Sequence, residues 1–185
     1  MASNSAPTGG AERYGPGDEA IGLEPGDFVL THREHLIGKF ISVAQKRRFR
    51  GPERVFAHWS HCALVVGPEG ELVEVDRPGV ERSPLAKYRP AEYHVVRLGP
   101  EVGPEARRRA TAYALARVGQ KFGYLAMFSA ALWLVFGWRL KLSRADHHIC
   151  STLVARALQE AGLIADLDPT FVLPADLARR FAARP

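Results

Sequence analysis

Cysteine is scarce in this chain, which has two cysteines, Cys62 and Cys150, among its 185 residues. The sequence has no C-x-x-C pair, and cysteines at that spacing are typical of structural zinc sites. Two cysteines are also too few for the disulfide framework of a small secreted domain. We therefore expect two free thiols, each placed for its own reason.

The sequence also lacks a secretory signal and long runs of one charge. Roughly the first twenty residues contain no basic start followed by an apolar segment, which predicts a cytoplasmic, reducing setting. The formal net charge is +5, and the basic residues cluster only in 46–50 and 107–109. Short clusters of this kind are usual on solvated faces, so no nucleic-acid partner is expected. The same clusters suit an anionic membrane surface.

The composition, with 46% hydrophobic residues over 185 positions, predicts one globular domain with a substantial core. Residues 1–23 are rich in Gly, Pro, Ser and Ala and contain almost no large apolar side chains. Such a segment cannot bury enough surface to offset its ordering. The sequence therefore predicts a disordered N-terminal tail over 1–23, followed by a single domain over 24–185.

Short β-rich runs predict strands over 26–30, 60–66, 71–76 and 92–98. The turn residues "GPEG" at 67–70 predict a hairpin between the second and third of these strands. We expect the strand over 92–98 to lie beside them in the same sheet.

Helices are predicted after the first strand and in three later segments. Thr31 and Glu34 have the spacing of a capping box and predict a helix that extends to about Gln45. Its apolar residues recur at every third or fourth position and predict one buried stripe, formed by Leu36, Ile37, Phe40, Ile41 and Ala44. Later helices are expected over 104–118, from Cys150 to about residue 161, and from Pro174 onward. A small, mostly antiparallel sheet flanked by helices is an α+β fold.

Cys150 stands at the first turn of one predicted helix, in the segment "HHICSTLVARAL". Unpaired backbone N–H groups and the positive end of the helix dipole favour a thiolate at such a position. A thiolate is a nucleophile, and catalytic cysteines work with a base that is oriented by a third group. Cys150 is therefore a candidate nucleophile.

The predicted hairpin supplies a base and a carboxylate. If Gly67 and Gly70 close the turn, the numbers of opposed residues sum to about 137. His61 then faces Asp76 directly and Glu74 diagonally, and a carboxylate beside an imidazole fixes its tautomer and raises its basicity. The opposite face is apolar and predicts that Cys62 is a structural core residue. That face carries Cys62, Leu64, Val66, Val73 and Val75.

Several segments resemble, in order and approximate spacing, the circularly permuted NlpC-like, papain-fold cysteine hydrolases. The segments are "GDFVL", "SHCALVV", "LVEVDRPGV", "GQKFGY" and "ICSTLVARALQEAGL". That group includes YiiX-like enzymes and relatives of lecithin–retinol acyltransferase. In the permuted order the histidine strand precedes the cysteine helix, as His61 precedes Cys150 here. The resemblance implies a permuted papain-like fold over about residues 26–180.

The resemblance also implies a role for each site residue. Cys150 would be the nucleophile, His61 the general base and Glu74 the orienting third member, with Asp76 as the alternative. Tyr124 would help to orient the site or stabilise the oxyanion. The implied activity is that of a thiol hydrolase or acyltransferase that needs no metal or organic cofactor. A peptide amide, a cell-wall amide and a lipid ester all fit this triad as substrates.

A zinc site is a second interpretation of the same residues. The chain offers His58, His61, Cys62, His147, His148 and Cys150 as ligands. The spacing is unfavourable, because His61 and Cys62 are adjacent on a strand and point to opposite faces.

A noncatalytic, membrane-associated lipid-binding protein is a third interpretation. The seventeen residues from Phe122 to Trp138 carry no charge, and as a helix of about 25 Å they are short for a membrane span. A single span there would put His61 and Cys150 on opposite sides of the bilayer. With the triad assembled, the segment is instead a core helix, a lid or a helix in contact with a membrane surface, and it favours a lipid or acyl substrate.

Overall fold

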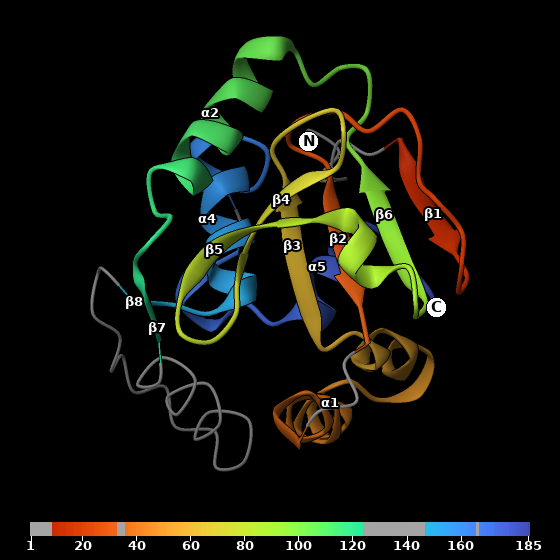
Figure 1. Cartoon of the computed structure of the whole chain (residues 1–185). Helices are drawn as coiled ribbons and strands as arrows, with labels where there is room; N and C mark the ends of the chain where they lie inside the picture. Colours follow the sequence, from red (N-terminus) through yellow and green to blue (C-terminus); the bar gives the residue numbers. More distant parts are fainter. Residues whose placement is uncertain (1–8, 33–35, 124–146, 166) are drawn as a thin grey trace, which may run out of the picture.

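The computed structural model describes residues 9–32, 36–123, 147–165 and 167–185. It is an α+β structure built on a six-stranded antiparallel sheet with the strand order β1-β6-β2-β3-β4-β5 (Figure 1). The strands are β1 (Gly10–Tyr14), β2 (Phe28–Thr31), β3 (His61–Val65), β4 (Glu71–Val75), β5 (Val80–Pro84) and β6 (Tyr93–Arg97). The predicted fold class is thus confirmed at the level of α+β.

Helices and a second, two-stranded sheet complete the described chain. The α-helices are α1 (Leu36–Arg48), α2 (Pro104–Leu115), α4 (Cys150–Glu160) and α5 (Pro174–Arg180). Three 3-10 helices are η1 (Gly51–His58), η2 (Leu85–Tyr88) and η3 (Pro169–Phe171). The strands β7 (Lys121–Phe122) and β8 (His147–His148) pair in parallel.

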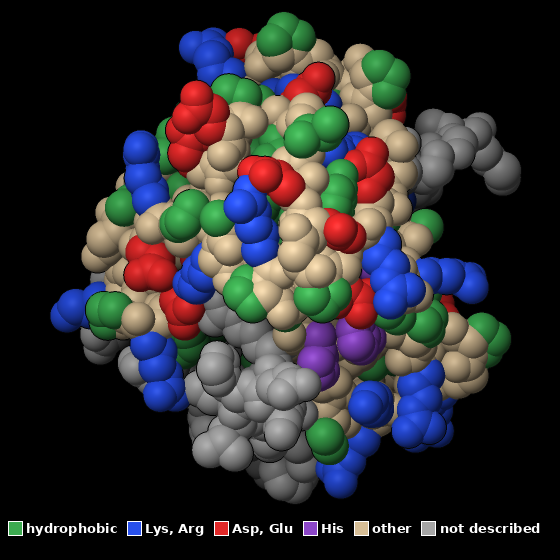
Figure 2. Space-filling model, turned by 45° about the vertical axis from the view of Figure 1, so that its right-hand side comes forward, with side chains coloured by type: hydrophobic (Ala, Val, Ile, Leu, Met, Phe, Trp, Pro, Cys, Tyr) green, Lys and Arg blue, Asp and Glu red, His purple; other side chains and the backbone are tan. Residues whose placement is uncertain are grey.

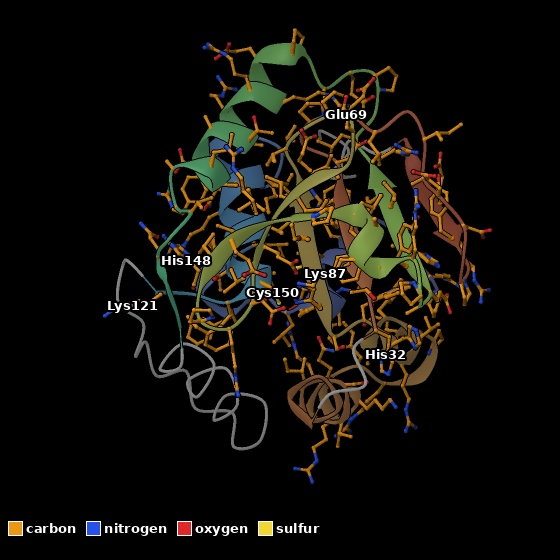
Figure 3. The ribbon with its side chains drawn as sticks, in the orientation of Figure 1. His32, Glu69, Lys87, Lys121, His148 and Cys150 are labelled. Atoms are coloured by element: carbon orange, nitrogen blue, oxygen red, sulfur yellow. The ribbon has the colours of Figure 1, made fainter. Side chains whose placement is uncertain are left out.

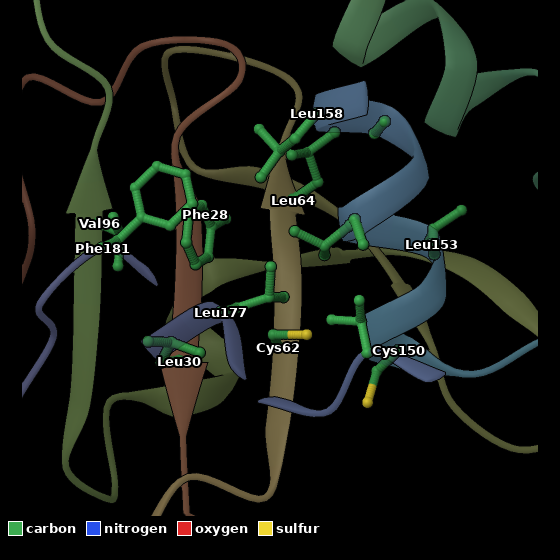
Figure 4. Packing of buried hydrophobic residues seen from close by; sticks show 14 of the residues in the cluster. Phe28, Leu30, Cys62, Leu64, Val96, Cys150, Leu153, Leu158, Leu177 and Phe181 are labelled. Carbon is green, nitrogen blue, oxygen red and sulfur yellow. The ribbon is translucent and has the colours of Figure 1, made fainter. Parts of the chain in front are cut away.

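The two faces of the large sheet pack into separate apolar clusters, because successive strand side chains alternate between faces. The larger cluster lies between the sheet and α4 and α5 (Figure 4). It includes Phe28, Leu30, Cys62, Leu64, Val96, Leu153, Leu158, Leu177 and Phe181. The smaller cluster joins strand residues such as Ala63, Val65 and Leu72 to Leu85 and Tyr88 of η2.

The central hairpin has the register that the turn sequence predicts. Ala63 pairs with Glu74, Leu64 with Val73 and Val65 with Leu72, so the paired numbers have the predicted sum of 137. The predicted strand over 92–98 is also present as β6, but it pairs with β1 and β2 and not with the hairpin. His61 is the first residue of β3, which lies between β2 and β4 near the centre of the sheet.

Part of the predicted N-terminal tail belongs to the sheet. Gly10–Tyr14 form the edge strand β1, which pairs with β6, and the Tyr14 ring stacks on the Tyr93 ring at 5.2 Å. Arg97 also donates hydrogen bonds to the backbone oxygens of Ile21 and Gly22. Backbone hydrogen bonds to β6 hold β1 in the sheet, so the low apolar content of this segment did not prevent strand pairing.

The predicted capping box at Thr31 is wrong. Thr31 lies within β2, and its hydroxyl donates to the backbone oxygen of Glu92 at 3.3 Å, while α1 begins at Leu36. Glu34 lies outside the described residues. Of the predicted apolar stripe only the Ile41 side chain is described, and it is partly buried.

Charged side chains of both signs lie on the face of the molecule that Figure 2 shows. Figure 2 shows basic and acidic side chains mixed over much of one face, with hydrophobic side chains between them. This mixture agrees with the modest net charge of +5. No helix among the described residues is long and apolar enough to cross a membrane.

Candidate active site

The candidate site lies where β3 begins and α4 begins. His61 and Cys62 precede the three residue pairs that join β3 to β4, and Cys150 is the first residue of α4. In the view of Figure 3, Cys150 lies between His148 and Lys87. The fold thus brings the two cysteines and His61 together from segments that are far apart in the chain.

His61 is bound to a buried carboxylate. Its Nε2 lies 2.7 Å from Oε2 of Glu74, and the His61 side chain is 5% exposed. Because Glu74 occupies Nε2, the nitrogen that is left to face the Cys150 thiol is Nδ1. The carboxylate therefore selects the tautomer with the proton on Nε2, in which Nδ1 is the basic atom.

Glu74 itself is held by four side chains. Tyr88 and His61 bind Oε2, while Ser83 and Lys87 bind Oε1 at 2.5 and 2.9 Å. Burial raises the pKa of the Glu74 carboxyl, but the hydrogen bond and charge of His61 and the two hydroxyl donors outweigh it. The net pKa lies well below the usual range of glutamate. Glu74 is consequently a fixed negative charge behind the imidazole.

Cys150 is in contact with both residues at the start of β3. A hydrogen bond with the Cys62 side chain is the strongest influence on the Cys150 thiol and lowers its pKa, whereas burial raises it. The charge of His61, its hydrogen bond and a backbone hydrogen bond from Cys62 lower the pKa further, to well below the usual value. A backbone group that lowers a thiol pKa is an N–H donor. The site therefore favours a thiolate beside an imidazolium.

The start of α4 is fixed by side-chain hydrogen bonds. The Thr152 hydroxyl accepts from the Ile149 N–H at 3.1 Å and donates to the Ile149 oxygen at 2.9 Å. The Ser151 hydroxyl donates to the Val172 oxygen at 2.7 Å. The Thr152 bonds fix the first helical turn, and the Ser151 bond holds that turn against the chain that leads into α5.

Asp76, the alternative third member, has other partners. Its Oδ2 lies 3.2 Å from Nζ of Lys87, and its Oδ1 accepts from the Arg77 N–H at 3.0 Å. Its side chain is 31% exposed, against 0% for Glu74. Of the two carboxylates, Glu74 is the one bound to His61 in this structure.

Two predicted features lie wholly or mostly outside the described residues. Tyr124 is outside them, and of the apolar segment from Phe122 to Trp138 only the first two residues are inside. Phe122 belongs to β7, where its N–H donates to the Pro78 oxygen at 2.9 Å.

The zinc interpretation gains nothing from the geometry. Nε2 of His148 is 2.9 Å from Oε1 of Gln120, and the His58 ring stacks on the His32 ring at 4.7 Å. Within the part of the chain that the structure describes, no three His, Cys, Asp or Glu side chains form a group suited to a metal ion.

Sequence reasoning missed the groups that surround Glu74. Ser83 lies on β5, and Lys87 and Tyr88 lie on η2, neither of which was predicted. The strand register accounts for Ser83 alone: β5 pairs Glu74 with Glu81 and Leu72 with Ser83, which puts Ser83 diagonally beside Glu74. The contact between Cys62 and Cys150 was missed as well.

No protein-family model matches the chain, and no curated protein matches it either.

Proposed function

We propose that the chain is a thiol hydrolase or acyltransferase of permuted papain-like fold that forms an acyl-enzyme on Cys150. The observation that carries the proposal is the chain of contacts from the Cys150 thiol through His61 to the buried Glu74 carboxylate. The lowered pKa of the Cys150 thiol and of the Glu74 carboxyl supports this chemistry, and the three groups come from three different elements, α4, β3 and β4.

The proposed reaction starts from the Cys150 thiolate. Its sulfur attacks the carbonyl carbon of an ester or amide, a C–S bond forms, and the carbonyl oxygen becomes an oxyanion. Backbone N–H groups at the start of α4 stabilise that oxyanion. The His61 imidazolium then donates its proton to the leaving group, and the carbon–heteroatom bond breaks to leave a thioester on Cys150.

The second half-reaction reverses the proton transfer. His61, now neutral, takes a proton from water or from an acceptor alcohol or amine, and that nucleophile displaces Cys150 from the thioester. Glu74 stays ionised throughout, holds Nε2 protonated and stabilises the imidazolium each time it forms. This chemistry needs no metal or organic cofactor.

The substrate class is a peptide, a cell-wall amide or a lipid acyl group. The uncharged segment from Phe122 to Trp138 favours an acyl or lipid substrate and contact with a membrane surface. A cytoplasmic enzyme with peripheral membrane association fits this composition.

Acylation by a panel of ester, thioester and amide probes tests the proposal. The wild-type protein should gain the acyl mass at Cys150 in the presence of a chelator, and Cys150→Ala should gain none. His61→Ala should slow acylation by about two orders of magnitude or more, because an unassisted thiol is only a few per cent ionised at neutral pH.

The matched control is His94→Ala, which removes a histidine of β6 that is as buried as His61. It should acylate at a rate within about threefold of the wild type if it stays folded by circular dichroism. A folded wild-type protein that no probe acylates would refute the proposal and favour a binding role.

A further inference from the structure

The only two cysteines of the chain lie side by side in the fold. Cys62 comes from β3 and Cys150 from α4, and both belong to the same buried cluster. Figure 4 shows the Cys62 side chain directed from β3 toward the start of α4, where Cys150 lies. Their side chains are in hydrogen-bonding contact. Packing alone does not require this arrangement, because alanine or valine would also fill a core position on β3.

We propose that Cys62 and Cys150 form a reversible redox site, in which a peroxide oxidises Cys150 and Cys62 then closes a disulfide with it. The disulfide would block the nucleophile, so the effect on catalysis rests on the proposed function. The formation of the disulfide is independent of that function.

The first step is the oxidation of Cys150 by a peroxide. The thiolate sulfur attacks one oxygen of hydrogen peroxide, an S–O bond forms, the O–O bond breaks, and the departing hydroxide takes the proton of the His61 imidazolium and leaves as water. The sulfur is oxidised by two electrons to a sulfenic acid and the peroxide is reduced. Cys150 is the residue that reacts, because its contacts with Cys62 and His61 lower its pKa and favour the thiolate.

Cys62 is placed to resolve the sulfenic acid. Its sulfur attacks the Cys150 sulfur, the S–S bond forms, the S–O bond breaks, and the hydroxyl group leaves as water with the proton that Cys62 gives up. The sum is two thiols and one hydrogen peroxide to one disulfide and two waters. His61 contacts Cys150 and is neutral after the first step, so a base lies beside the sulfur that is attacked.

The arrangement gives the site a protected oxidised state. A sulfenic acid without a neighbouring thiol goes on to sulfinic and sulfonic acids, which a dithiol does not reduce. A disulfide is reduced by thiol exchange, and cytosolic disulfides are usually transient and redox-sensing. Cys62 would therefore turn a lasting loss of the nucleophile into a reversible one.

Intact-mass and peptide measurements on the full chain test the proposal. Reduced wild-type protein treated with hydrogen peroxide should lose the mass of two hydrogen atoms and yield one peptide species that joins Cys62 to Cys150. Acyl-probe labelling should fall by at least about tenfold and return to within about twofold of the start after dithiothreitol. Cys62→Ala should instead gain two or three oxygen atoms at Cys150, and dithiothreitol should not restore its labelling.

Over-oxidation of Cys150 in the wild type, with Cys62 still a free thiol, would overturn the proposal. A disulfide that joins two chains would overturn it as well. If Cys62→Ala does not fold, Cys62→Ser replaces it. The masses of the oxidised wild-type protein test the disulfide without any variant. A disulfide in a protein whose reduced form no probe acylates would retain the redox site and refute only the proposed function.

Discussion

At the scale of single residues, the site depends on how firmly one imidazole is held. Glu74 fixes Nε2 of His61 at 2.7 Å, and Tyr88, Ser83 and Lys87 fix Glu74 in turn. Because four donors hold the Glu74 carboxylate in place, the hydrogen bond to that carboxylate limits the rotation of the His61 ring. Asp76 contacts the same Lys87 ammonium at 3.2 Å, at a more exposed position.

Glu74→Gln should therefore be far more damaging than Asp76→Asn. The amide no longer stabilises the imidazolium and can select the wrong tautomer of His61, so we expect kcat/KM for an acyl substrate to fall by about 10²–10⁴-fold. Asp76→Asn removes one partly exposed partner of Lys87 and should lower kcat/KM by less than about fivefold. The reverse ranking would move the third role to Asp76.

Residue-level reasoning from the sequence singled out His61, Glu74 and Cys150, but the residues alone did not predict that Cys150 lies against β3. The register of the hairpin follows from "GPEG", so the positions of His61, Glu74 and Cys62 on their faces were predictable. Which helix covers a face is a tertiary property that strand alternation does not encode. The position of Cys150 beside His61 was predicted only through the family resemblance. The contact between Cys150 and Cys62 was not predicted.

At the scale of elements, one buried polar side chain joins three helices. Gln45 of α1 donates to the Trp59 oxygen at 2.8 Å, next to η1, and accepts from the Ala175 N–H of α5 at 3.1 Å. It is fully buried. The apolar stripe predicted for α1 did not include Gln45 or Ser42, whose side chains both bind neighbouring backbone groups.

Gln45→Met keeps the size of the side chain and removes both hydrogen bonds. It should lower the free energy of unfolding by about 2–4 kcal/mol, because a buried oxygen and a buried N–H lose their partner. Urea unfolding measures the loss. The control is Lys46→Met, an exposed neighbour, which should stay within about 0.5 kcal/mol of the wild type. Equal stability of the two variants would show that the amide does not join these helices.

The elements that sequence reasoning missed are those with mixed polar character. The edge strands β1 ("GAERY") and β5 ("VERSP") contain few apolar residues. They are held through backbone pairing to β6 and β4, which hydrophobic periodicity does not detect. The central strands and α4 carry clear apolar patterns and were predicted for that reason.

At the scale of the whole molecule, acid should destabilise the fold in two steps. Burial lowers the pKa of His58 and His94 in the folded state. Their contribution to stability is therefore complete above the unfolded histidine pKa of about 6.5 and is lost as the pH falls below it. The folded pKa of Glu74 also lies below the usual value. Its contribution is complete above the unfolded carboxyl pKa of about 4.3 and declines as the pH falls further.

The free energy of unfolding, measured in urea from about pH 8 to pH 3, should therefore decline first below about 6.5 and again below about 4.3. Glu74→Gln should be less stable near neutral pH and should lose less stability than the wild type over the lower range. A Glu74→Gln profile parallel to the wild type below about pH 4.3 would contradict the depressed pKa of Glu74.

The central claim is that the Cys150 thiol has a lowered pKa because Cys62 binds it and because His61, backed by Glu74, lies beside it. The rate of alkylation by iodoacetamide as a function of pH, with peptide mapping of Cys150 and Cys62, tests this claim most directly. We expect Cys150 to react first, with a rate that rises well below the ordinary thiol pKa of about 8.5, and His61→Ala to move that rise to higher pH. Preferential labelling of Cys62, or a Cys150 profile near pH 8.5 that His61→Ala leaves unchanged, would contradict the account.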